Sequence, residues 1–257
     1  MARVFITGSS DGLGLMAGQL LADQGHKVVL HARNDARAAD AKKAAPKAEA
    51  VVVGDLASIA ATKDLVAQVN SLGRFDAVIH NAAVGFREEQ RATSDGVPNV
   101  FAINTLAPFI LTVLIERPKR LVYLSSGMHE SARANLDDIL WRKRSWDGSS
   151  AYAESKLHDA MLAFTVARYW PNVLSNAVTP GWVATKMGGA GAPDDIAQAH
   201  LTQAWLATSD EPAALTTGGY FYHLKQREPN PEALEVPLQD RLVDICEEIS
   251  GVRLPWS

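Results

Sequence analysis

Tyr152 and Lys156 are the two residues of this 257-residue chain whose spacing points most directly to chemistry. Residues Ala151–Tyr169 have the pattern of a helix, and positions four apart on a helix lie on one face, so the two side chains can converge. A free tyrosine has a pKa of about 10, too high for a base at neutral pH, but a neighbouring ammonium favours the phenolate. The pair is therefore a candidate acid/base catalyst, although the same spacing also arises by chance.

A glycine-rich turn follows the first apolar run, Arg3–Ile6, and leads directly into a helical pattern, Leu13–Gln24. Glycines permit a tight turn and a close approach of backbone to a pyrophosphate, and the N-terminus of a helix attracts an anion. The turn lacks the Gly-Lys-Ser/Thr ending of a nucleotide-hydrolase loop, so we expect a dinucleotide. Its expected contacts are Gly8, Ser10, Asp11, Gly12, Leu13 and Gly14.

Arg33 comes just after the second apolar run, where a dinucleotide enzyme meets the adenosine ribose. An acidic residue there would bind a free 2′-hydroxyl and repel a 2′-phosphate, whereas a guanidinium can hold the phosphate through two hydrogen bonds. The sequence therefore favours NADP(H) over NAD(H). A solvated surface arginine with no ligand is the alternative.

Composition excludes several other classes of protein. The net charge of −4 comes without a dense basic run, so we do not expect nucleic acid as a partner. Cys246 is the only cysteine, which rules out an internal disulfide and fits a cytoplasmic protein, and no histidine or cysteine spacing predicts a metal site. The most apolar stretch, 101–115, is interrupted by polar residues and predicts a buried helix and no membrane span.

The elements that must position these residues alternate between strand and helix, without a linker or a repeat. Continuous apolar runs predict seven strands covered on both faces. The expected strands are Arg3–Ile6, Lys27–His31, Ala50–Val53, Asp76–His80, Leu121–Leu124, Val173–Val178 and Gly219–Tyr222. The expected helices are Leu13–Gln24, Asp35–Ala45, Ser58–Ser71, Asn99–Ile115, Ala151–Tyr169, Asp194–Ala207 and a last one near Leu238–Ile249. The fold class is α/β: a single-domain, doubly wound, seven-stranded parallel sheet over residues 1–257, with its ligand crevice beyond the strands' carboxyl ends.

Taken together, the motifs resemble the short-chain dehydrogenase/reductase family, which has a Rossmann fold. Their order and spacing agree across nearly the whole chain, although no single motif would suffice. The residues that carry the resemblance are the Thr7-Gly8-x-x-x-Gly12-x-Gly14 turn, Asp55-Leu56, Asn81-Ala82-Ala83, Asn104, Ser125-Ser126, Tyr152-x-x-x-Lys156 and Pro180-Gly181.

The resemblance implies a catalytic role for four residues. Tyr152 would exchange a proton with the substrate oxygen, and Lys156 would bind the nicotinamide ribose and lower the pKa of the tyrosine. Ser126 would hold the substrate oxygen, with Ser125 as the fallback. Asn104 resembles the asparagine that binds a water connected to the lysine; a polar residue at a helix break is the alternative.

The resemblance also implies further cofactor contacts. Asp55 resembles the acid that contacts the adenine amine, and the segment from Asn81 to Ala83 would pass beneath the adenosine ribose. The segment around Pro180, Gly181, Val183 and Thr185 resembles the one that binds the nicotinamide carboxamide. The full expected set is Gly8, Ser10, Asp11, Gly12, Leu13, Gly14, Arg33, Asp55, Leu56, Asn81, Ala82, Ala83, Tyr152, Lys156, Pro180, Gly181, Val183 and Thr185.

This chain departs from the family pattern in two places. Ala83 stands where the family commonly has glycine, which adds a methyl beside the cofactor path. Ser126 and Tyr152 are 26 positions apart, longer than in many members, so that Met128–Ser149 is an insertion. A similarly long spacing occurs in the retinol-dehydrogenase-like branch, and it permits a bulky, apolar substrate if the insertion lines the pocket; an external excursion is the alternative. Residues 186–200 begin with a glycine-containing loop that we expect near the substrate.

The leading hypothesis from the sequence is an NADP(H)-dependent oxidoreductase that interconverts a small-molecule carbonyl and its alcohol. The alternatives are a dinucleotide-binding sensor or scaffold without chemistry, and an epimerase or ene-reductase of the same fold. The sequence leaves open the substrate, the direction, and whether the chain is a monomer or pairs into dimers or tetramers through the helices at Asn99–Ile115 and Ala151–Tyr169.

Overall fold

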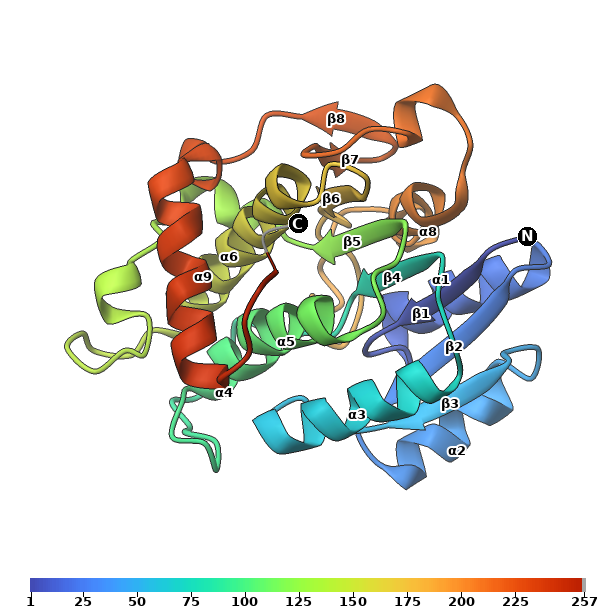
Figure 1. Ribbon diagram of the computed structural model, residues 1–257, viewed down its shortest axis with the longest axis horizontal. Helices are drawn as coiled ribbons and strands as arrows, with labels where there is room; N and C mark the ends of the chain where they lie inside the picture. Colours follow the sequence, from blue (N-terminus) through green and yellow to red (C-terminus); the bar gives the residue numbers. More distant parts are fainter. Residues whose placement is uncertain (256–257) are drawn as a thin grey trace.

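One sheet organises the chain, and the computed structural model describes residues 1–255 of it (Figure 1). Within these residues the strand order is β3-β2-β1-β4-β5-β6-β7-β8, and all pairs from β3 to β7 are parallel. This confirms the doubly wound α/β class. The parallel strands are β1 Arg3–Ile6, β2 Lys27–Ala32, β3 Ala50–Val53, β4 Ala77–His80, β5 Arg120–Leu124, β6 Leu174–Val178 and β7 Tyr220–Tyr222.

The sheet has one strand more than the seven expected. β8, Lys225–Arg227, pairs antiparallel with β7 through a tight turn in which His223 and Leu224 have positive φ angles of 47° and 63°. Its three residues are polar and exposed, so no apolar run marked it as a strand. A short, charged strand is a usual way to end a sheet without offering an edge to other chains.

Helices cover both faces because neighbouring residues of each strand point to opposite sides. Val4 and Ile6 pack into one apolar cluster and Phe5 into the other. The first cluster includes residues of α1 Gly12–Asp23, α2 Asp35–Ala44 and α8 Leu201–Thr208. The second includes residues of α3 Ile59–Ser71, α5 Ala107–Leu114 and α6 Gly148–Tyr169.

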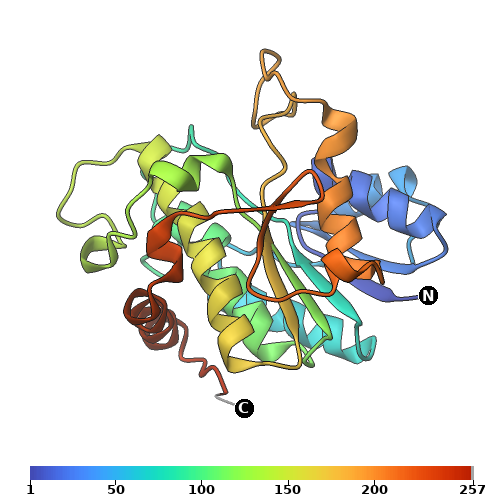
Figure 2. The same ribbon diagram turned by 90° about the horizontal axis from the view of Figure 1, so that it is seen from above.

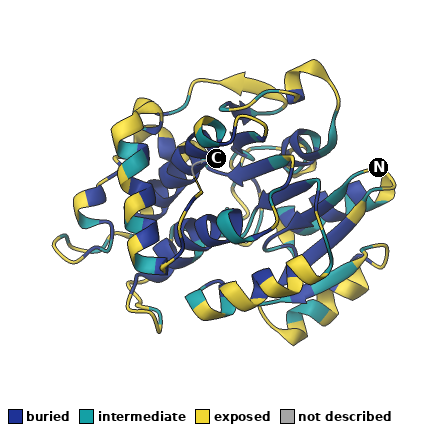
Figure 3. Cartoon of the chain, viewed as in Figure 1, coloured by how far each residue is buried: buried dark blue, intermediate teal, exposed yellow. Residues whose placement is uncertain are grey.

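The C-terminal helix α9, Val236–Ser250, forms a further layer outside α6, seen at the edge of Figure 1. Every residue of α6 from 151 to 166 is buried within the single chain. Buried residues are dark blue in Figure 3. Trp170, just after α6, donates from its indole nitrogen to the carbonyl of Pro255 at 2.9 Å. The chain thus covers the outer face of α6 with its own C-terminal segment.

The helix expected at Asn99–Ile115 contains a wider turn. It runs as α4 Asn99–Phe101, η1 Ala102–Leu106 and α5, and η1 is a π-helical turn that contains Asn104. Pro108 has no backbone N–H and cannot bond to the carbonyl four residues earlier, which is that of Asn104, so the regular ladder is interrupted here.

The helix expected at Asp194–Ala207 begins later and is divided. Asp194 lies outside it because its carboxylate accepts a hydrogen bond from the Trp182 backbone N–H at 2.6 Å. Asp195 caps α7, Ile196–Ala199, and α8 follows from Leu201. The remaining short elements are η2 Gly127–Ser131, η3 Leu136–Asp138, η4 Pro212–Ala214 and η5 Pro231–Leu234. Among residues 1–255, no helix is both long enough and apolar enough to cross a bilayer.

Candidate active site

The first turns of α6 hold Tyr152 and Lys156 at the carboxyl end of β5. Asp147 caps this helix by accepting a hydrogen bond from the Ser150 N–H at 2.7 Å. The Lys156 ammonium lies 5.8 Å from the centre of the Tyr152 ring, and both residues are buried. Lys156 donates to the carbonyl of Leu124 and to the carboxylate of Asp159, each at 2.7 Å. The helix therefore brings the expected phenol and amine together.

The paired serines after β5 have different surroundings. Ser125 is buried and donates its hydroxyl proton to the Lys156 carbonyl at 2.7 Å. Ser126 lies on the wall of the large cavity that Tyr152 also lines, and its hydroxyl accepts from the Met128 N–H at 3.3 Å. Ser126, and not Ser125, is thus placed to meet a ligand in that cavity.

Asn104 is fully enclosed by protein. Its amide oxygen accepts from the Val84 N–H at 2.9 Å, and its amide nitrogen donates to the Val84 carbonyl and to the Ser155 hydroxyl, both at 3.0 Å. The side chain therefore ties the π-helical turn to the segment after β4 and to α6. It supports the wall of the site behind Tyr152.

The glycine-rich turn between β1 and α1 is fastened to its neighbours. Gly8 has a φ of +60°, and a Cβ atom there would lie 2.6 Å from Cα of Ala82, so only glycine fits. Asn81 donates to the carbonyls of Thr7 and Gly8 at 2.9 and 3.0 Å, which joins the turn to the end of β4. The Ala82 N–H also bonds to the Thr7 hydroxyl, at 3.0 Å.

His31 holds the turn from the other side, a role that sequence analysis missed. Its Nδ1 accepts from the Gly8 N–H at 2.9 Å, which leaves Nε2 to donate to the Gly54 carbonyl at 2.8 Å. Burial lowers the pKa of His31, so the neutral ring that this pattern requires is favoured. The only sequence signal was a histidine within an otherwise apolar strand.

The N-terminus of α1 is open to an anion. Asp11 occupies the cap position, but its side chain makes no capping hydrogen bond to the helix. Its carboxylate instead contacts the Arg37 guanidinium at 2.5 Å and the Lys186 ammonium at 2.8 Å. Partial burial would raise the pKa of Asp11, but Lys186 and Arg37 together lower it. The first N–H groups of α1 are left for a ligand.

The region after β2 and β3 presents polar groups to solvent. Arg33 is exposed directly after β2, and Arg37 extends from the first turn of α2 toward Asp11. Arg37 was not singled out from the sequence, although a second arginine four positions beyond Arg33 was a visible signal. Asp55 is exposed after β3, whereas Leu56 is buried in the core.

The segment after β6 borders the same cavity. Gly181 has a φ of +84°, and a Cβ atom there would lie 2.5 Å from the Asp194 carboxylate, so glycine is required. Thr185 lines the cavity and accepts from the Gly188 N–H at 3.1 Å. The loop continues through Lys186, whose bond to Asp11 connects it to the glycine-rich turn; Figure 2 shows it as an orange loop standing out from the body.

A cavity of about 860 Å³ unites these elements. Seven of the residues predicted as site residues line it: Leu13, Ser126, Tyr152, Pro180, Gly181, Val183 and Thr185. Its remaining wall is largely apolar and aromatic, formed by Phe86, Met128, Trp182, Met187, Tyr220 and Tyr222, and its charged members are Glu130, Asp194, Arg227 and Glu228. Neither Asn104 nor Lys156 is among the lining residues, since both lie behind that wall.

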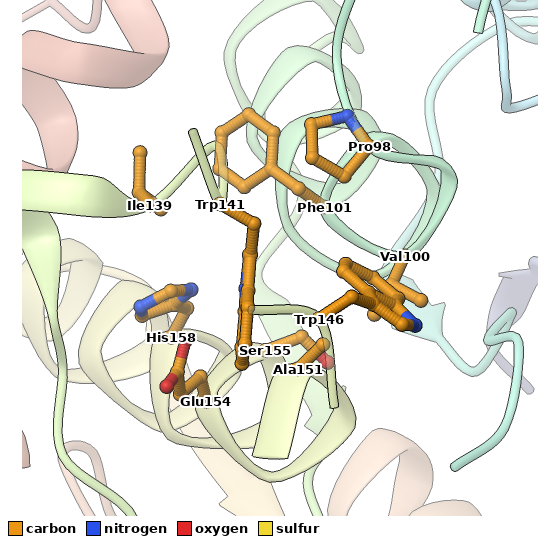
Figure 4. Close-up of a pocket in the computed structure, with 10 residues that line it drawn as sticks. All are labelled: Pro98, Val100, Phe101, Ile139, Trp141, Trp146, Ala151, Glu154, Ser155 and His158. Carbon is orange, nitrogen blue, oxygen red and sulfur yellow. The ribbon is translucent and has the colours of Figure 1, made fainter. Parts of the chain in front are cut away.

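The insertion at Met128–Ser149 contributes to the cavity only at its two ends, through Met128, Glu130 and Ser149. Its middle packs elsewhere: Figure 4 shows Trp141 and Trp146 standing between α6 and residues near Pro98 and Phe101. These residues border a small separate cavity of about 10 Å³, the size of one water.

Arg144 anchors the middle of the insertion to α6. Its guanidinium binds both carboxylate oxygens of Glu154, at 2.6 and 3.0 Å, and lies over the Trp141 ring at 3.9 Å. The insertion is thus a fixed part of the wall beside α6.

The residues fit a bound dinucleotide. A Cβ atom built at Gly12 would meet nothing within 4 Å, so there is open space beside the uncapped N-terminus of α1. Leu13, the next residue of α1, lines the large cavity together with Tyr152 and Thr185, so this open space adjoins the cavity. No cluster of three or more acidic, histidine or cysteine side chains arranged for a metal occurs within residues 1–255.

Several known proteins are similar to this chain in sequence. A family model described as short chain dehydrogenase matches residues 2–121. An uncharacterized oxidoreductase of Emericella nidulans is 46% identical over 99% of both chains, and the short-chain dehydrogenase chyC of Penicillium rubens is 43% identical over 99% of this chain and all of the other. Human retinol dehydrogenase 13 is 28% identical over 98% of this chain and 85% of its own.

A solved structure shares the fold. The crystal structure of a blue fluorescent protein from a metagenomic library, in complex with NADPH, superposes with a TM-score of 0.70 at 22% identity. The match covers 86% of this chain and 95% of that one.

Proposed function

This chain belongs to the short-chain dehydrogenase/reductase family, and from that premise we propose that it is an NADP(H)-dependent oxidoreductase interconverting a carbonyl compound and its alcohol. The observation that carries the proposal is the placement of Tyr152 and Ser126 on one cavity wall, with the Lys156 ammonium behind the tyrosine. These are the groups needed to bind an oxygen atom and to exchange a proton with it.

In the proposed mechanism Tyr152 gives its phenol proton to the substrate oxygen as the carbonyl is reduced, and takes it back in the reverse direction. Ser126 donates a hydrogen bond to the same oxygen, which stabilises negative charge that develops there. The positive charge of Lys156 favours the ionised phenol that remains after the proton has left. The nicotinamide cofactor, when bound, supplies or accepts the hydride.

The cofactor assignment rests on the cations beside the adenosine end of the path. Arg33 and Arg37 flank the turn after β2, and no acidic residue stands at the end of that strand. Guanidinium groups suit a phosphate because they can donate two parallel hydrogen bonds to it. The NADPH complex of a protein with the same fold is consistent with this preference.

The proposed substrate is apolar and of more than minimal size. The cavity that Tyr152 lines also presents Phe86, Met128, Trp182 and Met187, side chains that bind apolar surface well. One relative is named for retinol, which is in keeping with an apolar ligand.

The test is the substitution Tyr152→Phe, which removes the hydroxyl and keeps the ring. We expect turnover of aldehydes and ketones with NADPH to fall by at least about 100-fold, because general acid catalysis contributes that much. Tyr169→Phe is the matched control, since Tyr169 lies on the same helix outside the cavity lining and bonds to Asp240. Circular dichroism of each variant checks that the fold is retained.

The outcomes separate the alternatives. Turnover that survives Tyr152→Phe would overturn the proposed role of the phenol. Tight NADPH binding by the wild type without turnover of any carbonyl in a broad panel would favour a sensor or scaffold. Identification of the products distinguishes carbonyl reduction from epimerisation or double-bond reduction.

A further inference from the structure

Lys156 has a partner that the proposed mechanism does not use. Asp159, one turn further along α6, accepts a hydrogen bond from the Lys156 ammonium at 2.7 Å, and each side chain is only 3% exposed. The carbonyl of Leu124 takes a second N–H of the same ammonium. Because an ammonium has three N–H donors, only one is left to face the cavity side.

A carboxylate at this position depends on the lysine. Burial raises the pKa of Asp159, and the charge of Lys156 opposes that rise. Because both groups are buried, the charge of each is compensated mainly by the other and not by water. The two groups therefore form one buried ion pair. The Lys156 ammonium of this pair lies 5.8 Å from the centre of the Tyr152 ring.

The other titratable groups that pack against this ion pair are held neutral. Tyr123 of β5 faces Asp159, and burial raises the pKa of its phenol. Its hydroxyl shares a hydrogen bond with Thr112 of α5 at 2.6 Å, and Thr112 contacts Nε2 of His80 of β4 at 3.0 Å. Burial lowers the pKa of His80 to about 3, so this ring is also uncharged at neutral pH.

Other ionisable groups of α6 face the insertion. Glu154 is bound to Arg144, and His158 donates from Nε2 to the Ala134 carbonyl at 3.0 Å while its Nδ1 faces Thr105. Burial lowers the pKa of His158 to about 4, which keeps it neutral as well. Burial raises the pKa of Asp159 to about 7, so above that pH its carboxylate is the group that directly compensates Lys156.

We propose that Asp159 is a positioning residue of the active site, which fixes the Lys156 ammonium beside the Tyr152 ring and balances its charge. This inference rests on the roles proposed above for Tyr152 and Lys156. It assigns to Asp159 control over how strongly the ammonium charge acts on the Tyr152 phenol.

The substitution Asp159→Asn separates charge from hydrogen bonding. The amide oxygen can still accept from Lys156, but the negative charge is gone, so that the ammonium acts on Tyr152 without compensation. We expect ionisation of Tyr152 to move to lower pH, because the positive charge that favours the phenolate is no longer balanced.

The measurement needs neither substrate nor cofactor. The absorbance of tyrosinate is followed against pH in pairs that differ only at position 152: wild type against Tyr152→Phe, and Asp159→Asn against the double variant. Each difference isolates the titration of Tyr152. The exposed Asp64 of α3 provides the matched control, because Asp64→Asn removes a carboxylate that does not line the cavity and should leave the titration unchanged.

A second readout uses the reaction. For a carbonyl substrate that the wild type turns over, the pH profile of kcat should shift in the same direction in Asp159→Asn, with KM for the substrate changed less than twofold. Asp159→Glu, which restores the charge, should return the profile toward that of the wild type. Should Asp159→Asn fail to fold, Asp159→Ser is smaller, also neutral, and carries the same expectation.

An unchanged Tyr152 titration in a folded, neutral variant at position 159 would overturn the inference. This outcome is distinct from failure of the proposed function, which would appear as a wild-type protein without carbonyl turnover. The absorbance titration gives a result in either case.

Discussion

Ser125 and Lys156 are joined by a hydrogen bond from the serine hydroxyl to the backbone carbonyl of the lysine, at 2.7 Å. This bond links the end of β5 to the first turns of α6 and uses the only proton that the Ser125 hydroxyl can donate. The neighbouring Ser126 points to the cavity. Ser125 thus serves the structure, whereas the adjacent Ser126 faces the cavity.

Substitution of each serine by alanine should separate these roles. Ser126→Ala removes the proposed donor to the substrate oxygen, and we expect kcat to fall about 100-fold with little change in stability, as for other donors to a developing oxyanion. Ser125→Ala should instead lower the free energy of unfolding by about 1 kcal/mol, the usual contribution of one buried hydrogen bond. Steady-state kinetics and urea unfolding measure the two effects. The opposite pattern would show that Ser125 is the substrate-binding serine.

Cofactor preference should depend on Arg33 and Arg37. We expect Arg33→Ala and Arg37→Ala each to lower kcat/KM for NADPH by about tenfold, since each removes a charge-assisted contact to the 2′-phosphate, and to leave the value for NADH within about twofold. Arg74→Ala is the control, because Arg74 is exposed and near Glu116. Equal use of NADH and NADPH by the wild type would contradict the assignment.

The chain should be a monomer in solution. Residues 151–166 of α6 are all buried within one chain, and α9 packs along the outside of this helix. Because the chain itself already covers this face of α6, the face is not free to pack against a second copy. Light scattering coupled to size exclusion should give the mass of one chain. A dimer at micromolar concentration would show that another face is used.

Acid should destabilise the protein through its buried histidines. The folded pKa of His158 is lowered to about 4, below its value of about 6.5 in the unfolded chain. Above pH 6.5 the His158 ring is neutral in both the folded and the unfolded state. As the pH falls toward 4, His158 becomes protonated in the unfolded chain but stays largely neutral in the folded protein. Stability is therefore lost on acidification, by about 3 kcal/mol from this group at pH 4.

Urea unfolding of wild type and His158→Gln at pH 7 and pH 4.5 measures this contribution. Glutamine can keep the hydrogen bond to Ala134 but does not titrate, so the wild type should lose more stability between the two conditions than the variant does. Equal losses in both proteins would indicate that His158 is not the source. His80, whose pKa is lowered to about 3, should add a similar contribution.

Much of the fold followed from local patterns. The continuous apolar runs predicted the seven parallel strands because a strand covered on both faces needs apolar side chains on both. The glycine-rich turn after β1 and the helical spacing of Tyr152 and Lys156 are likewise local, since each depends only on residues close together in the sequence. β8 was not predicted because Lys225–Arg227 has no apolar side chain to bury.

The amino-acid sequence by itself determined the strand and helix order, the position of the glycine-rich turn and the proximity of the phenol and the amine. Only the tertiary structure decided which serine meets the cavity, that Arg37 and Lys186 converge on Asp11, and that Asp159 shares a buried site with Lys156. The reason is physical. Local periodicity fixes which face of an element a residue occupies, whereas burial and partnership depend on segments far apart in the chain that meet only after the sheet has formed.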